Sequence, residues 1–310
     1  SATTHFPIWH KEIEDIIVLK NNKGSEDNRV RKLDYSIQLS KLFYERFLKN
    51  EDISLFSPHD VPGLYDAFGT DEFDELYEKY ERAYSVPKKK VNCQTLILEL
   101  LKERAETGRI YIMNIDHANS HSSFKDKINM SNLCQEITLP TKPIQSLHDT
   151  QGEIALCILS AINVGILKDL DDLEELCDIS VRALDEIIDY QEYPIVAAES
   201  STKSRRSLGI GYIGLAHYLA KCKVKYNDKD AYKIIDETTE AFQYYLLKAS
   251  NNLAKEKGKC VLFHRTKYAD GILPIDTYKK DVDDIVKRKL SYDWESLRKD
   301  IICLLYTSDA

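Results

Sequence analysis

Helical periodicity over most of its length is the feature that most constrains how this chain can fold. Apolar residues recur at i, i+3, i+4 and i+7 in residues 32–49 and 91–107, which is the spacing of an amphipathic helix. The same period predicts helices at Leu173–Tyr190 and Ala231–Lys257, and the second ends at Gly258, a residue type common at helix C-caps. Much of the core must therefore be built from helices.

Strand patterns are short and confined to the middle third of the chain. They cover Arg109–Ile115, Gln135–Leu139 and Glu153–Asn163, and polar, turn-rich segments separate them. No repeat period or low-complexity linker interrupts the sequence. Strands separated by helices predict one domain of the α/β class.

Composition and charge exclude several classes of protein. A hydrophobic content of 43% can bury a substantial core, and a formal net charge of -8 argues against a broad surface for nucleic acid or anionic membrane. No apolar run approaches the roughly 18 residues of a membrane span. Seven scattered cysteines without a CxxC pair fit neither a disulfide scaffold nor a zinc site. We expect a cytoplasmic protein with one or two functional thiols.

The segment INMSNLCQEITLP, residues 128–140, sets one thiol between an amide and a carboxylate. In an extended chain the side chains of Asn132, Cys134 and Glu136 point to the same side. A lone cysteine is commonly a small buried hydrophobe, but Asn and Glu are costly to bury without partners. The spacing leaves two interpretations open: a polar pocket around a functional thiol, or an ordinary structural strand.

A second cysteine, Cys157, lies in the apolar stretch EIALCIL, where a core position is the simplest interpretation. Segments joined by a loop of this length often lie side by side. Cys134 and Cys157 would then face one cavity and could carry out redox chemistry as a pair.

Two patterns imitate known sites. Gly209–Gly214 reads GIGYIG, the glycine spacing of a dinucleotide-binding loop. The polar stretch 200–207 precedes it in place of the buried strand that such a loop requires, so we expect a helix whose glycines allow close packing. His117 and His121 have the spacing of a metal pair, but without a third ligand we expect a loop with two solvated or hydrogen-bonding histidines. A nicotinamide-dependent oxidoreductase using GIGYIG and a helical structural module are the alternative functions.

Longer stretches resemble one enzyme family, the catalytic large subunit of class I ribonucleoside-diphosphate reductase of the bacterial and T-even-phage type. The resemblance runs in order from Trp9 to Ile301. It is carried by LFSPHDVPGLYDAF (55–68), TGRIYI (107–112), SNLCQEITLPTKP (131–143), GEIALC (152–157) and DGILPIDTYKKD (270–281). The resemblance implies a ten-stranded α/β barrel with a central finger loop, of which residues 1–302 would form an incomplete, helix-rich catalytic domain.

The resemblance also implies roles for individual residues. Cys134, at the tip of the finger, would be the thiyl radical that removes the 3′-hydrogen of a ribonucleoside diphosphate. Glu136 would act as general base for the 3′-hydroxyl group, and Asn132, with Ser131 beside it, would bind the ribose hydroxyls. Cys157 and a second cysteine outside residues 1–310 would supply the electrons and become a disulfide. The product would be a 2′-deoxyribonucleoside diphosphate for DNA synthesis.

Partners follow from the same resemblance. A metal-containing small subunit would deliver the radical, thioredoxin or glutaredoxin would reset the disulfide, and large subunits would form a homodimer. No metal site and no bound cofactor are expected in this chain, and nucleotide effectors would bind mostly outside it. We expect the chain to be inactive alone. Because the resemblance stops near Cys303, residues 303–310 (CLLYTSDA) are expected to be a non-native tail.

Overall fold

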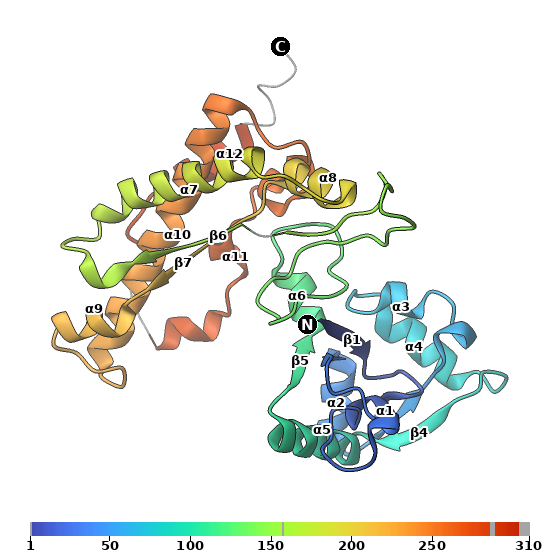
Figure 1. The fold of residues 1–310 in the computed structure, drawn as a ribbon. Coiled ribbons are helices and arrows are strands. Elements are labelled where there is room, and N and C mark those ends of the chain that lie inside the picture. The colour runs from blue at the N-terminus through green and yellow to red at the C-terminus, as the bar shows by residue number, and fades with distance from the viewer. Residues whose placement is uncertain (1, 157, 286–288, 304–310) are drawn as a thin grey trace. The chain divides into compact units, whose positions relative to one another are not determined.

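The computed structural model describes residues 2–156, 158–285 and 289–303, which form two compact units (Figure 1). Unit 1 contains the residues up to 122 together with 127–140, and unit 2 contains 123–126 and the residues from 141 onward. Each unit has its own hydrophobic core. The extent of the catalytic domain, residues 1–302, stays a prediction.

Unit 1 alternates short strands with helices. Its strands are β1 (Thr3–Pro7), β2 (Asp34–Leu39), β3 (Asp52–Leu55), β4 (Lys89–Asn92) and β5 (Ile110–Asn114). Its helices are α1 (Ile13–Ile17), α2 (Lys41–Lys49), α3 (Leu64–Ala67), α4 (Phe73–Arg82), α5 (Cys93–Thr107) and α6 (Ile115–His121). The predicted helix at 91–107 and the predicted strand at 109–115 are confirmed as α5 and β5.

Strand β2 is the centre of a three-stranded parallel sheet, between β1 and β5. In the register of this sheet, Ser36 lies opposite His5 of β1 and Tyr111 of β5. Every residue of β2 is buried. Because side chains alternate along a strand, Ile37 belongs to the apolar core while Ser36 and Gln38 lie on the opposite face, which is polar. This polar face positions the candidate site described below.

Residues 32–49 do not form the single helix that their periodicity predicts. Asp34–Leu39 is β2, and α2 begins only after Ser40, whose side chain accepts a hydrogen bond of 3.4 Å from the backbone N–H of Phe43. Such a hydroxyl cap satisfies a donor that has no partner within the helix. The stretch DYSIQL alternates polar and apolar residues with a period of two, but the apolar residues of α2 follow at once and hide that period.

The core of unit 1 is rich in large aromatic side chains. Tyr77 of α4 is fully buried, and its hydroxyl group bonds to both backbone groups of Ser54 in β3. It accepts from the N–H and donates to the C=O, each at 2.7 Å. Strand β4 pairs with one edge of β3, and this hydroxyl group bonds to the other edge, where no strand of the described residues lies.

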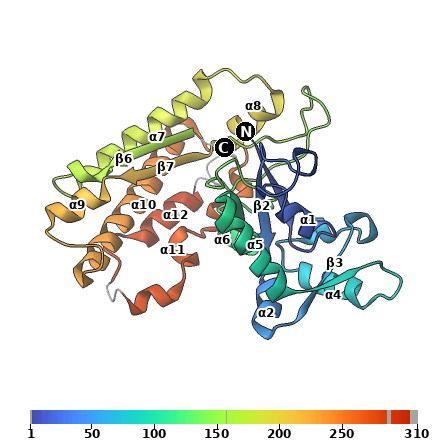
Figure 2. The same ribbon diagram turned by 60° about the horizontal axis from the view of Figure 1, so that its bottom comes forward.

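Unit 2 is built around a pair of parallel strands and two long helices (Figure 2). Its strands are β6 (Ile158–Asn163) and β7 (Leu208–Ile213). Its helices are α7 (Asp172–Tyr190), α8 (Val196–Arg205), α9 (Leu215–Lys221), α10 (Lys229–Lys257), α11 (Pro274–Thr277) and α12 (Trp294–Cys303). Helix α7 packs against both β6 and α10. The predicted helices at 173–190 and 231–257 are confirmed as α7 and α10.

Two expectations about unit 2 need correction. Of the strand predicted over Glu153–Asn163, the structure contains the second part, Ile158–Asn163, which is β6. The GIGYIG stretch is not a helix, because Leu208–Ile213 is β7 and pairs with β6. Gly214 then begins α9 with a φ of +80°, and a Cβ there would lie 2.3 Å from Asn163 Oδ1. In the described part of the chain, no helix combines the length and the apolar character needed to cross a membrane.

Candidate functional site

Residues 128–137, called the cysteine loop below, lie over the polar face of β2 in unit 1. Gln38 Nε2 donates to the carbonyl oxygen of Asn129 at 2.7 Å, and Ser36 Oγ donates to Gln135 Oε1 at 2.9 Å. Ser36 is 0% exposed and Gln38 is 1% exposed, so these hydrogen bonds are sheltered from water. Ser36 and Gln38 therefore have hydrogen-bond partners in the loop, as buried polar groups require.

The base of the cysteine loop is held by helix α6. Asn119 Oδ1 accepts from the N–H of Ile128 at 2.7 Å, and Asn119 Nδ2 donates to the carbonyl oxygen of the same residue at 3.1 Å. The expectation of a loop around His117 and His121 is thus wrong, since both belong to α6. Their rings meet edge to face with centroids 6.0 Å apart. Asn119 lies between the two histidines in the sequence, and its side chain is the one that holds the cysteine loop.

The tip of the cysteine loop is a turn and not a strand, so the predicted strand Gln135–Leu139 is absent. The N–H of Gln135 donates to the carbonyl oxygen of Asn132 at 3.2 Å, and Gln135 has a φ of +64°. This left-handed residue reverses the chain. The extended geometry expected for Asn132, Cys134 and Glu136 is therefore wrong, but two of the three side chains, Asn132 and Glu136, still meet. The convergence of Cys134 with them stays a prediction.

Asn132 and Glu136 meet across the turn. Asn132 Nδ2 donates to Glu136 Oε1 at 2.6 Å, and Asn132 Oδ1 accepts from the N–H of Ile137 at 3.1 Å. The Ser131 hydroxyl group donates to the same amide oxygen at 3.3 Å. Glu136 and Cys134 are exposed in this unit. The turn thus presents an amide, a carboxylate and a thiol within five consecutive residues.

A hydrogen bond from β1 holds the residue before the thiol. Thr3 Oγ1 donates to the carbonyl oxygen of Leu133 at 2.7 Å. Sequence reasoning missed Thr3, Ser36, Gln38 and Asn119 as residues that position the loop. For Ser36 and Gln38 the signal was available, because polar residues alternate with the apolar residues of DYSIQL.

The remaining thiols differ in accessibility. Cys157 lies outside the described residues, so its expected proximity to Cys134 stays a prediction. Cys93 and Cys177 are fully buried, and burial raises the pKa of Cys93 to about 11 and that of Cys177 to about 12. Such thiols are inert near neutral pH because the thiolate is the reactive form. Cys222 is exposed, but in the sequence Ala220 and Val224 take the places that Asn132 and Glu136 have around Cys134.

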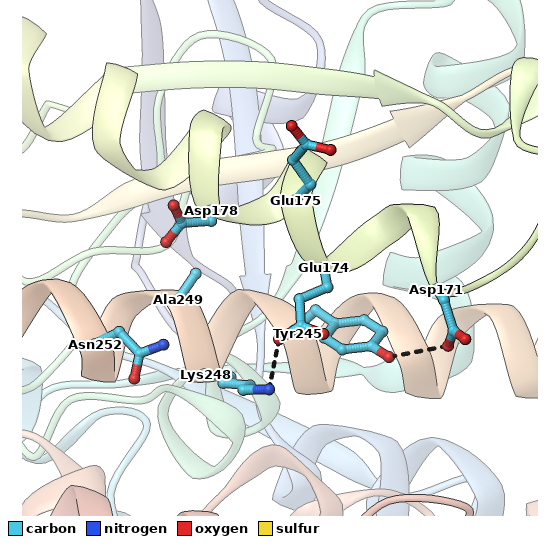
Figure 3. Close-up of a pocket in the computed structure, with 8 residues that line it drawn as sticks. All are labelled: Asp171, Glu174, Glu175, Asp178, Tyr245, Lys248, Ala249 and Asn252. Atoms are coloured by element: carbon cyan, nitrogen blue, oxygen red, sulfur yellow. Dashed lines mark hydrogen bonds and ion pairs between the residues drawn. The ribbon is translucent and has the colours of Figure 1, made fainter.

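A groove of about 440 Å³ lies between α7 and α10 in unit 2 (Figure 3). Four carboxylates line it, from Asp171, Glu174, Glu175 and Asp178. Lys248 Nζ pairs with Glu174 at 2.5 Å, and the Tyr245 hydroxyl group donates to Asp171 at 3.3 Å. The lining contains no thiol or imidazole group. Within the part of the chain that the structure describes, no three His, Cys, Asp or Glu side chains are grouped as metal ligands.

Comparison with known families places the chain in one of them. The family described as "Ribonucleotide reductase, barrel domain" matches residues 1–303. The chain belongs to this family. The α/β class expected from the sequence is confirmed, and the strands of the described residues form three separate small sheets without closing into a barrel.

Relatives named ribonucleoside-diphosphate reductase subunit alpha match nearly the whole chain. The protein of Haemophilus influenzae is 57% identical over 306 residues, and subunit alpha of reductase 1 from Escherichia coli is 56% identical over 306 residues. The protein of Enterobacteria phage T4 is 44% identical over 309 residues. Each match covers 97% of this chain and 40% of the relative. The chain therefore spans about two fifths of the length of these ribonucleotide reductase subunits.

Ribonucleotide reductase family membership leaves the nicotinamide alternative without support. Gly209 and Gly211 lie within β7, Gly214 follows it as the N-cap of α9, and helix α8 precedes the stretch in place of a buried strand. A dinucleotide-binding loop needs the reverse order, with the glycines following a strand. The helical-module alternative is not supported either, because the relatives are enzyme subunits by name.

Proposed function

We propose that this chain is the part of a ribonucleoside-diphosphate reductase large subunit that carries the radical cysteine. Family membership and the names of the relatives support the proposal. The observation that carries it is the 2.6 Å hydrogen bond from Asn132 to Glu136, which spans Cys134. An amide and a carboxylate on either side of a thiol are the groups needed to hold a ribose ring, accept its proton and remove its hydrogen atom.

In the proposed reaction, Cys134 as a thiyl radical takes the 3′-hydrogen atom of the bound ribonucleoside diphosphate and becomes a thiol. Glu136 accepts the proton of the 3′-hydroxyl group as general base. Asn132, with Ser131 beside it, hydrogen-bonds the ribose hydroxyl groups and fixes the ring relative to the thiol.

The 2′-hydroxyl group then leaves as water. Cys157 and a second cysteine supply two electrons and two protons for this step, and their sulfur atoms become a disulfide. Cys134 returns its hydrogen atom to C3′ at the end. The proposed net reaction converts a ribonucleoside diphosphate and two thiols into a 2′-deoxyribonucleoside diphosphate, water and a disulfide.

The proposal includes partners. The name "subunit alpha" of the relatives supports a second kind of subunit, and we assign it the metal centre that oxidises Cys134. Thioredoxin or glutaredoxin would reduce the disulfide, and the large subunits would act as a homodimer in the cytoplasm. Nucleotide effectors would bind mostly outside this chain.

A hybrid subunit tests the function. Residues 2–302 of this chain replace the matching segment of the Haemophilus influenzae subunit, and CDP reduction is measured with the cognate small subunit and thioredoxin. We expect turnover. A hybrid that folds, as judged by circular dichroism and cooperative unfolding, yet reduces no CDP would refute the proposal.

The role of Glu136 is tested in the same hybrid. Glu136→Gln keeps the size of the side chain but removes the base, and kcat should fall at least about 100-fold. The control is Glu192→Gln, which changes an exposed carboxylate of unit 2 and should keep full activity. Equal activity of the Glu136→Gln variant and the parent would remove Glu136 from the mechanism.

A further inference from the structure

We infer that Gln135 is a positioning residue for the reaction proposed above. Its side chain joins the cysteine loop to two neighbouring strands of the parallel sheet, and its backbone makes the turn that brings Glu136 to Asn132. The inference rests on the proposed function and adds a residue that does not itself touch the reacting groups.

The amide group of Gln135 spans β2 and β5. Its Oε1 accepts from Ser36 Oγ at 2.9 Å, and its Nε2 donates to the carbonyl oxygen of Ile112 at 2.8 Å. Ser36 and Ile112 lie on adjacent, hydrogen-bonded strands. An acceptor at one end and a donor at the other fix both the position and the orientation of the amide group. The loop is thereby tied to the most buried strand of unit 1.

The backbone of Gln135 needs this restraint. Its φ of +64° lies in the left-handed region, which residues other than glycine seldom adopt. The two side-chain hydrogen bonds offset that cost. Without them, other conformations of the turn become more populated, and the carboxylate of Glu136 is no longer held beside Asn132.

The position of the turn matters because the reacting groups sit on either side of Gln135. Cys134 precedes it and Glu136 follows it, so a rotation of this one residue moves the thiol and the base relative to each other. Displacements of about 1 Å in an active site can reduce a rate about 100-fold. Loss of Gln135 should therefore lower kcat more than it weakens substrate binding.

The test uses the hybrid subunit defined above. Gln135→Ala should lower kcat for CDP about tenfold while KM stays within about twofold. Gln145→Ala, which shortens an exposed glutamine of unit 2, is the matched control and should leave both constants unchanged. A Gln135→Ala variant with the kcat of the parent would overturn the inference.

Two more variants separate the side chain from the backbone. Gln135→Gly adopts a left-handed φ without strain but keeps neither hydrogen bond, so it should be as impaired as Gln135→Ala. Full activity of the glycine variant would show that backbone conformation alone matters, and would also overturn the inference. Ser36→Ala should lower kcat less, and adding it to Gln135→Ala should cause no further loss, because both changes break the same contact.

A readout independent of catalysis distinguishes this inference from the proposed function. In the 310-residue chain, the N–H of Ile137 donates to Asn132 Oδ1, and its hydrogen exchange reports whether the turn is closed. Gln135→Ala should accelerate this exchange about tenfold, whereas Gln145→Ala should not. Unchanged exchange refutes the anchoring role. An inactive parent hybrid, by contrast, refutes the proposed function and leaves the exchange result valid.

Discussion

Replacing Tyr77 by phenylalanine should destabilise unit 1, because the backbone N–H and C=O of Ser54 both lose their hydrogen-bond partner. The Tyr77 hydroxyl oxygen accepts from the N–H of Ser54, its O–H donates to the C=O of Ser54, and Ser54 is 0% exposed. Each buried group left without a partner costs about 1–3 kcal/mol, and relaxation recovers part of the sum. We therefore expect the free energy of unfolding to fall by about 3 kcal/mol. The ring and its contacts with Phe56 and Phe73 remain.

Native-state hydrogen exchange at the amides of β3 and β4 measures this loss. Tyr84→Phe removes the hydroxyl group of a fully exposed tyrosine and should change the free energy of unfolding by less than about 0.5 kcal/mol. A loss below about 1 kcal/mol for Tyr77→Phe, or equal losses for both variants, would refute the reasoning.

The same hydroxyl group sets a pH dependence. Burial raises the pKa of Tyr77 above its ordinary value of 10.0, so the unfolded chain loses this proton first as the pH rises. The contribution of Tyr77 to stability is complete below pH 10.0 and is lost above it. Tyr77→Phe should remove this part of the alkaline decline, and an unaltered decline would contradict the assignment.

Two further predictions concern a glycine and a thiol. Gly214→Ala should destabilise unit 2 by about 1–3 kcal/mol, because φ is +80° and the new Cβ would lie 2.3 Å from Asn163 Oδ1, while Gly211→Ala meets open space and should be tolerated in thermal unfolding. Equal effects of the two substitutions on the melting temperature would contradict this account. Iodoacetamide at mildly alkaline pH should modify Cys222 but not Cys177, because burial raises the pKa of Cys177 to about 12. Peptide mass spectrometry measures both rates, and similar rates would disprove the burial of Cys177.

The long helices could be predicted from sequence, whereas the cysteine loop could be predicted only in part. Helices α7 and α10 carry uninterrupted apolar periodicity, so the local sequence is enough to predict them without knowledge of tertiary contacts. Strand β2 was missed because its period of two runs directly into the period of α2. The turn at Gln135 has no local signal, since its left-handed φ depends on Ser36 and on the carbonyl oxygen of Ile112, both distant in sequence.

The proximity of Asn132 and Glu136 was expected for the wrong geometric reason. The alternation argument assumed an extended segment, whereas a turn brings the two side chains together. Family resemblance had supplied the same grouping without any geometry. The roles of Cys134 and Cys157 remain proposals, because the first rests on chemistry that needs partners and the second lies outside the described residues.

Strand β2 is covered on both faces. The apolar core of unit 1 packs on one face, and the polar groups of the cysteine loop lie on the other. A shift of its pairing by one residue would turn Ile37 toward the backbone carbonyl of Asn129 and bury Ser36 and Gln38 among apolar side chains. Both halves of that exchange are unfavourable, so the strand can settle in only one alignment. The loop that carries the thiol thus helps to fix the register of β2. A strand paired in the wrong register would lose the hydrogen bonds from Ser36 and Gln38 to this loop, and the loop would lose its order as well.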